Sequence, residues 1–233
     1  MSKPVKKTGP KSKKAAGKNP PATIVHNPFP CHVTSREFTD MDFNDRLRNG
    51  IWRQRALDPN GLTRSNVSGT WHSQDNIFTQ LGEDGQTLKD MFAKAMMQWG
   101  SLIGLKPDAS VNMKMQAWAM VYSDRGYATV HTHPNCHVSG VYYVDDTTDD
   151  TNLTMATGAK LEAGSIEFVN PIPNGHQSSL MHLNPSFSQP FKRGLMLIFP
   201  SALAHFVHPL VTEKGERISV ACNASFYPSK ETS

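Results

Sequence analysis

Cysteine is scarce in this 233-residue chain: there are three, and no two of them form a CxxC pair. An odd number of widely spaced cysteines argues against a disulfide framework and indicates a reducing compartment. The sequence also lacks an apolar run near the roughly 20 residues that cross a bilayer, and it begins without the apolar core of a signal peptide. We therefore expect no membrane span, and a protein of the cytoplasm, or of the host-cell cytoplasm if it is viral.

Acidic residues are missing from residues 1–22, which carry seven lysines among prolines and glycines. Such a segment buries too little apolar surface to offset the entropy of ordering, so we expect a disordered basic tail. Taking these seven from the 24 Lys and Arg residues leaves 17 against 20 acidic residues, so residues 23–233 should form one mildly acidic domain. We expect the tail either to aid solubility or to make weak contact with nucleic acid or an acidic surface.

Hydrophobic periodicity changes along the chain from a helical to a strand pattern. Residues 40–57 and 86–103 have apolar residues at helical spacing, and Asp40 is placed to cap the first helix. From residue 111 the period falls to two, with turn residues between the runs. The predicted strands are 113–122, 128–133, 137–144, 164–169, 194–199, 204–208 and 217–226. Helices followed by many short strands indicate an α+β fold whose helices cover one sheet of a β-sandwich or barrel.

Two histidines in the segment VHTHPNCHVSGVYYV, His131 and His133, are two residues apart. Residues i and i+2 of a strand point to the same face, so they are either paired metal ligands or paired buried polar groups. A third ligand is expected late in the chain, where His205 follows an apolar strand. Beyond it, Arg217 and Ser219 share a strand face, and a guanidinium beside a hydroxyl suits a bound carboxylate.

Three motifs in this order resemble those of the Fe(II)- and 2-oxoglutarate-dependent oxygenases. They read HTHPNCHVSGVYY, FPSALAHFVHP and RISVACN. The resemblance is closer still to a 2OG-Fe(II) oxygenase family common in phages and marine bacteria, and AWAMVY and TWHS look like further landmarks of that family. It covers roughly residues 23–228 and leaves the basic tail outside.

This resemblance implies a double-stranded β-helix fold, the jelly-roll or cupin-like barrel, with the N-terminal helices packed on one sheet. It also implies the activity of a non-heme iron dioxygenase, or hydroxylase. Such an enzyme uses Fe(II), O2 and 2-oxoglutarate, and couples oxidative decarboxylation of 2-oxoglutarate to hydroxylation of a prime substrate. The loops of a fold decide selectivity, so the substrate itself does not follow from the resemblance.

Carried over residue by residue, the resemblance implies that His131, His133 and His205 bind the iron. The common non-heme iron site has two histidines and one carboxylate, and here His133 stands where the carboxylate is expected. A histidine keeps a ligand but removes a negative charge, so the reduction potential of bound iron should be higher. Three histidines also suit catalytic zinc, and if His133 does not ligate, water takes its position.

For the cosubstrate, the resemblance implies that Arg217 and Ser219 hold the far carboxylate of 2-oxoglutarate. Tyr143 lies on a nearby strand and is our further candidate for this contact. Two other functions stay open: a non-enzymatic cupin-like binding or virion module, and a three-histidine cupin enzyme that does not use 2-oxoglutarate.

Overall fold

The computed structural model describes residues 31–106, 111–146, 152–154, 160–172, 185–212 and 215–229. The predicted basic tail at residues 1–22 and the start of the predicted domain at residue 23 lie outside these residues. The tail's disorder and its contact with acidic partners therefore stay predictions. Among the described residues, no helix is long and apolar enough to span a membrane.

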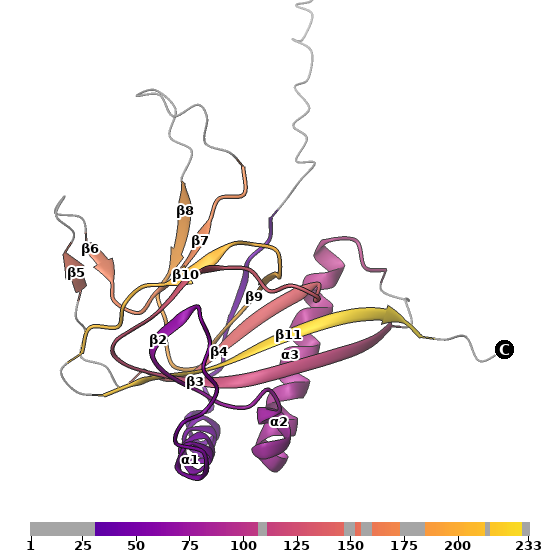
Figure 1. Ribbon diagram of the computed structural model, residues 1–233. Coiled ribbons are helices and arrows are strands. Elements are labelled where there is room, and N and C mark those ends of the chain that lie inside the picture. Colours follow the sequence, from indigo (N-terminus) through magenta and orange to yellow (C-terminus); the bar gives the residue numbers. More distant parts are fainter. Residues whose placement is uncertain are drawn as a thin grey trace, which may run out of the picture. The chain divides into compact units, whose positions relative to one another are not determined.

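A curled antiparallel sheet of nine strands forms the centre of the fold (Figure 1). Its order is β1-β9-β4-β11-β3-β10-β7-β8, and β2 pairs with β3 outside this path. The strands are β1 (Thr34–Glu37), β2 (Val67–His72), β3 (Val111–His131), β4 (Val138–Asp146), β7 (Ile166–Val169), β8 (Ser186–Gln189), β9 (Leu195–Pro200), β10 (His205–Val207) and β11 (Arg217–Pro228). Two more, β5 (Asn152–Thr154) and β6 (Lys160–Glu162), form a separate hairpin.

Three helices cover one face of this sheet: α1 (Met41–Leu57), α2 (Ile77–Gln80) and α3 (Gly82–Leu102) (Figure 1). The predicted helix at 40–57 is confirmed, and the Asp40 carboxylate caps it by accepting from the Phe43 N–H at 2.9 Å. The predicted second helix is confirmed with a start four residues earlier, at Gly82. It ends one residue before its expected end, and Ile103, predicted to lie within it, is about half exposed.

The two faces of the sheet carry different side chains, because successive residues of a strand point in opposite directions. On β11, Ile218, Val220 and Cys222 belong to the core between the sheet and the helices. Arg217 and Ser219 alternate with them and line a cavity on the other face. The helices therefore close one side of the sheet, and the polar residues of the strands gather on the other.

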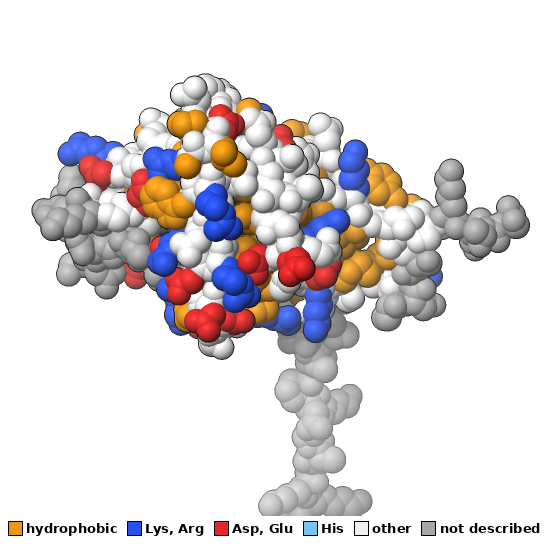
Figure 2. All heavy atoms as spheres, turned by 90° about the horizontal axis from the view of Figure 1, so that it is seen from below, with side chains coloured by type: hydrophobic (Ala, Val, Ile, Leu, Met, Phe, Trp, Pro, Cys, Tyr) orange, Lys and Arg blue, Asp and Glu red, His pale blue; other side chains and the backbone are white. Residues whose placement is uncertain are grey.

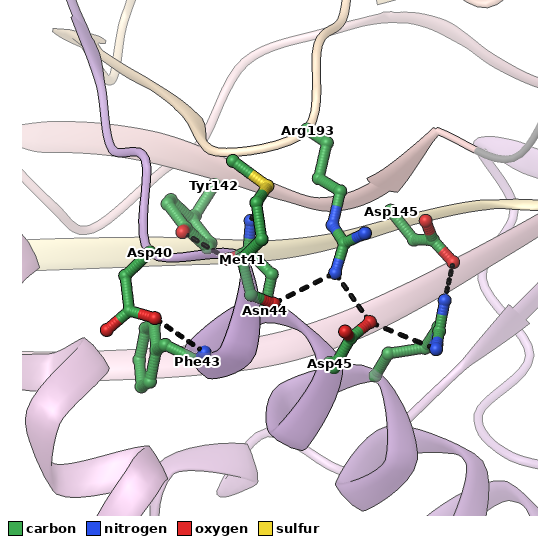
Figure 3. A network of polar contacts seen from close by, with 9 residues as sticks. Asp40, Met41, Phe43, Asn44, Asp45, Tyr142, Asp145 and Arg193 are labelled. Atoms are coloured by element: carbon green, nitrogen blue, oxygen red, sulfur yellow. Dashed lines mark hydrogen bonds and ion pairs between the residues drawn. The ribbon is translucent and has the colours of Figure 1, made fainter.

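Polar contacts fasten α1 to the sheet and to the segment between β8 and β9 (Figure 3). The Tyr142 hydroxyl of β4 donates to the Asn44 Oδ1 at 2.5 Å, and both residues are buried. Arg193, between β8 and β9, pairs with Asp45 at 2.6 Å. Because Tyr142 points to the helices, its neighbour Tyr143 must point to the cavity.

Strand β3 differs from prediction: 113–122 and 128–133 are parts of one 21-residue strand, with no turn between them. The segment SDRG contains turn-forming residues, but here it forms an irregular stretch in which Arg125 adopts φ 60°. Gly69 of β2, at φ +61°, approaches this stretch so closely that a Cβ would lie 2.8 Å from the Gly126 Cα. An irregularity of this kind bends a strand without ending it. Strand β3 thus pairs with β11 before the irregularity, with β2 on both sides of it, and with β10 after it.

Charges of both signs are interleaved on the face of the molecule seen from below Figure 1 (Figure 2). One pair, Arg46 Nε and Asp84 Oδ1 at 2.9 Å, joins α1 to α3. A mixed surface of this kind produces no large field of one sign. The charges that matter for chemistry lie instead in the cavity on the opposite face of the sheet.

Candidate active site

A cavity of about 610 Å³ lies on the face of the sheet opposite the helices. All six residues that the sequence predicts for the site line it: His131, His133, His205, Tyr143, Arg217 and Ser219. Its size is typical of small-molecule sites. The fold thus brings the predicted metal ligands and the predicted carboxylate clamp into one cavity, while their roles stay predictions.

Three histidines converge at one side of this cavity. His131 ends β3, His205 begins β10, and the two are direct partners in the antiparallel pairing of those strands. His133 follows β3, where its backbone N–H donates to the Ser201 carbonyl at 2.9 Å. Each of the three offers a ring nitrogen, and these atoms lie within 4.8 Å of one another. Three nitrogens at that separation can surround one metal ion.

Hydrogen bonds fix the orientation of two of these rings. His131 Nδ1 lies 2.7 Å from the Thr129 carbonyl, and His205 Nδ1 lies 2.8 Å from the Leu203 carbonyl. A carbonyl can only accept, so Nδ1 carries the proton in both rings and Nε2 keeps its lone pair. This is the usual support of a metal-binding histidine.

Burial keeps the three imidazoles uncharged at neutral pH. Desolvation lowers the pKa of His131, and it lowers that of His133 to about 4 and that of His205 to about 3. The mutual repulsion of the three rings lowers the last two further. A neutral imidazole is the form that binds metal, so protons compete little for these nitrogens near pH 7.

Arg217 is the largest of the fully buried side chains and is 1% exposed. Its Nη1 donates to the Gly164 carbonyl at 2.7 Å, and its guanidinium carbon lies 4.0 Å from the centre of the Tyr122 ring. Within the part of the chain that the structure describes, its Nε has no hydrogen-bond partner and no carboxylate lies within ion-pair distance of it. A buried charge without a counter-ion is costly, so this arrangement suits an anionic ligand.

Two phenols stand beside this guanidinium. Tyr143 pairs in register with Ser219, and its ring centre lies 5.5 Å from the Arg217 guanidinium carbon. Burial raises the pKa of Tyr143 to about 12 and also raises that of Tyr122, although the nearby Arg217 opposes both shifts. Both hydroxyls therefore remain protonated: that of Tyr122 donates to the Met120 Sδ at 3.6 Å, and that of Tyr143 can donate to an anion. Tyr122 was not predicted, although it ends AWAMVY and shares the strand face of Trp118.

The sequence also did not predict that the stacked rings of Trp118 and His72 lie beside the three histidines. The ring centres of Trp118 and His133 are 5.9 Å apart, and His72 stacks on Trp118 at 5.7 Å with the two planes 11° apart. Trp118 and His72 belong to the segments AWAMVY and TWHS. Those segments were recognised as landmarks, but no motif spacing assigns either residue a chemical role.

Two further histidines lie outside the cluster. His208 Nε2 contacts Glu167 Oε2 at 2.5 Å, and the exposed His137 accepts from the Phe226 N–H at 3.0 Å. Proximity to the cluster in sequence is therefore not enough to place a histidine in it.

Comparison with known proteins supports the resemblance seen in the sequence. Residues 116–223 match the family described as "Putative 2OG-Fe(II) oxygenase". These residues include every residue predicted for the site, and the match confirms the predicted resemblance. No curated protein matches the sequence.

Solved structures identify the fold. A prolyl-4-hydroxylase from Pseudomonas putida aligns with a TM-score of 0.54 and 14% identity, over 84% of this chain and 92% of that one. A prolyl hydroxylase from Trichoplax adhaerens, in complex with a peptide fragment of the hypoxia-inducible factor oxygen degradation domain, aligns with a TM-score of 0.55. It is 9% identical, over 83% of each chain. At these identities the likeness concerns the fold, and it confirms the predicted double-stranded β-helix with N-terminal helices.

Proposed function

We propose that this chain, whose residues 116–223 match the 2OG-Fe(II) oxygenase family, is an Fe(II)- and 2-oxoglutarate-dependent dioxygenase that hydroxylates an unidentified substrate. The observation that carries the proposal is a buried guanidinium without a counter-ion among the described residues, facing the same cavity as three convergent imidazoles. A metal site alone would not need that arginine. A dicarboxylate that reaches from a metal to a cation would occupy both.

Each part of the site has a task in this proposal. His131, His133 and His205 would hold Fe(II) through neutral nitrogens, and Arg217 would pair with the far carboxylate of 2-oxoglutarate. Bound together, iron and 2-oxoglutarate supply the oxidising chemistry, in which O2 is activated as 2-oxoglutarate decarboxylates to succinate. The protonated hydroxyl of Tyr143 can donate to the carboxylate that Arg217 holds, and Ser219 can add a second hydroxyl.

The residues that line the cavity fit both Fe(II) and 2-oxoglutarate. Among the described residues, the Nε2 atoms of His131 and His205 have no hydrogen-bond partner, and the Nε of Arg217 is a donor without an acceptor. Apolar side chains of Ile166, Phe199 and Val207 line the same cavity and limit the access of water. Low local dielectric strengthens the pairing of an anion with Arg217.

The proposal is tested by anaerobic loading with Fe(II) followed by titration with 2-oxoglutarate. We expect one Fe(II) per chain and a visible absorption band that requires 2-oxoglutarate, because its keto acid chelates the iron. Glutarate, which lacks the keto group, is the matched control and should give no band. Metal binding without a band would favour a three-histidine enzyme that does not use 2-oxoglutarate, and binding of neither would favour a non-enzymatic module.

The role of His133 can be tested separately with His133→Asp. If His133 ligates, a carboxylate in its place rebuilds the common facial triad and supplies a charge, so iron should be retained at one per chain. The measurement is the iron content after anaerobic loading and desalting. His137→Asp is the matched control, since it changes an exposed histidine of the same segment and should leave the iron content unchanged. A His133→Asp protein that unfolds readily and holds no iron would show that His133 is structural.

A further inference from the structure

The cavity continues past the histidines, away from Arg217. On the paired strands β3 and β11, Arg217 is opposite Tyr122, and four residues along, Ala221 is opposite Trp118. Four residues of a strand span roughly 13 Å. Trp118 therefore lies beside the metal ligands at a distance from the anion clamp, and the small Ala221 leaves space in front of it. We call the part of the cavity around Trp118 and Ala221 the Trp118 end. A substrate that is oxidised at the metal must come close to this end.

Two polar atoms near Trp118 have no hydrogen-bond partner among the residues that the structure describes. The indole N–H of the half-buried Trp118 donates to no described residue. His72, 4% exposed, has its Nδ1 2.6 Å from the Ser73 carbonyl, so Nδ1 carries the proton and Nε2 is left as an acceptor. Its burial lowers the pKa of His72, which keeps that ring neutral. The end beside the metal thus offers one donor and one acceptor from two stacked rings.

The charges at this end cancel. Among the described residues that line the cavity, only Arg64, Asp75 and Arg217 are charged. Arg64 Nη2 lies 3.0 Å from each carboxylate oxygen of Asp75, so those two neutralise each other. Arg217 lies at the other end and is assigned to 2-oxoglutarate. A charged substrate group would therefore lose its hydration here without meeting an unpaired side chain of opposite charge.

Asn223 extends the same surface. It lies opposite Gln116 in the register of β11 and β3, and its Oδ1 accepts from the Ser139 hydroxyl at 2.8 Å. That bond leaves the amide N–H groups of Asn223 as further donors. The surface is therefore neutral and richer in donors than in acceptors.

We infer that Trp118 and His72 select a substrate that presents an uncharged amide, as a carboxamide or a peptide bond, beside the metal. This inference rests on the proposed function and names its substrate class. An amide carbonyl accepts two hydrogen bonds, which suits the Trp118 and Asn223 donors, and an amide N–H can donate to His72 Nε2. Neither a free amino acid nor a phosphate ester matches side chains that carry no unpaired charge near Trp118.

The test uses the full chain loaded with Zn(II) and 2-oxoglutarate, because zinc is not redox-active and the ligands are not consumed. The probe is a pool of uncharged tetrapeptides, each acetylated at one end and amidated at the other. The comparison pools contain the same amino acids in free form, neutral monosaccharides and nucleosides. Ligand retained after ultrafiltration is quantified by mass spectrometry, and binding of 2-oxoglutarate is measured separately.

We expect some capped peptides to be retained at least tenfold more than any compound of the other pools. Trp118→Phe keeps an aromatic ring but removes the N–H, and should lower this retention roughly five- to tenfold. The same variant should bind zinc and 2-oxoglutarate as the wild type does. Trp52→Phe, in a 42% exposed tryptophan of α1, is the matched control and should change nothing.

The two proposals fail in different ways. If the zinc form binds no 2-oxoglutarate, the proposed function is wrong and the substrate class falls with it. If it binds 2-oxoglutarate but retains no capped peptide, or retains sugars, nucleosides or free amino acids equally well, the amide inference alone is overturned. Full retention by Trp118→Phe would also overturn it.

Discussion

Replacing Arg217 with methionine is expected to weaken 2-oxoglutarate binding by about 30- to 5000-fold and to leave metal affinity nearly unchanged. Loss of a buried, charge-assisted pair typically costs about 2–5 kcal/mol, which corresponds to that range. Methionine fills much of the same volume without a charge. The measurement is a titration of 2-oxoglutarate into the anaerobic iron protein, together with the iron content of each preparation.

Although it weakens 2-oxoglutarate binding, the same substitution should not lower the stability of the ligand-free protein. Without a ligand, the wild-type protein holds a guanidinium that is 1% exposed and has no counter-ion among the described residues. Methionine removes that desolvation penalty, so the ligand-free variant should have an equal or higher free energy of unfolding. Wild type should gain stability when 2-oxoglutarate is added, and the variant should not.

Arg55→Met is the matched control for this experiment. Arg55 pairs with Glu216, the residue before Arg217, at 2.9 Å and is partly exposed. Its loss should leave 2-oxoglutarate binding unchanged. An Arg217→Met protein that still requires 2-oxoglutarate at the wild-type concentration would show that this arginine does not hold the cosubstrate.

Replacing His205 with alanine is expected to lower metal affinity by more than about 100-fold. Loss of residues that merely orient a metal ligand typically costs 10- to 100-fold, and loss of a ligand itself should cost more. His205 supplies the nitrogen that faces both other histidines, with ring centres 4.4 Å from that of His131 and 5.1 Å from that of His133. Competition of the apo protein against a chelator of known affinity gives the measurement.

His208→Ala serves as the control for His205→Ala. His208 lies three residues later and contacts Glu167 outside the cluster, so its loss should leave metal affinity unchanged. Circular dichroism and thermal unfolding of both variants separate loss of metal from loss of fold. Wild-type metal affinity in a folded His205→Ala protein would remove His205 from the ligand set.

Periodicity predicted the main elements and which residues face the cavity, but it did not predict how β3 continues. The amphipathic pattern of α1 and the alternation on β11 reflect burial on one face, so both elements and the cavity-facing positions of Arg217 and Ser219 followed from periodicity. The turn expected at 123–126 was wrong, because glycine and aspartate favour a turn and a bulged strand alike. Only the pairing partners of β3 decide between the two.

The residues that surround the predicted site residues could not be predicted from periodicity or motifs. His72 and Trp118 are 46 positions apart, and they meet because β2 pairs with β3, a contact that no local pattern records. The missing counter-ion of Arg217 is likewise a property of the folded chain. A sequence shows which residue carries a charge, but the charges that surround it depend on tertiary structure.

The single strand β3 places the proposed metal ligands at a boundary in local stability. Its first half pairs with β11 over twelve residues, from Val111 to Tyr122. Its last residues pair with β10, which has three. Short, weakly connected strands open by local unfolding more often than long central ones. Amide hydrogens of β10 should therefore exchange with solvent faster than those of β11, and a metal that joins His131 to His205 would slow them by cross-linking the short strand β10 to the long strand β3.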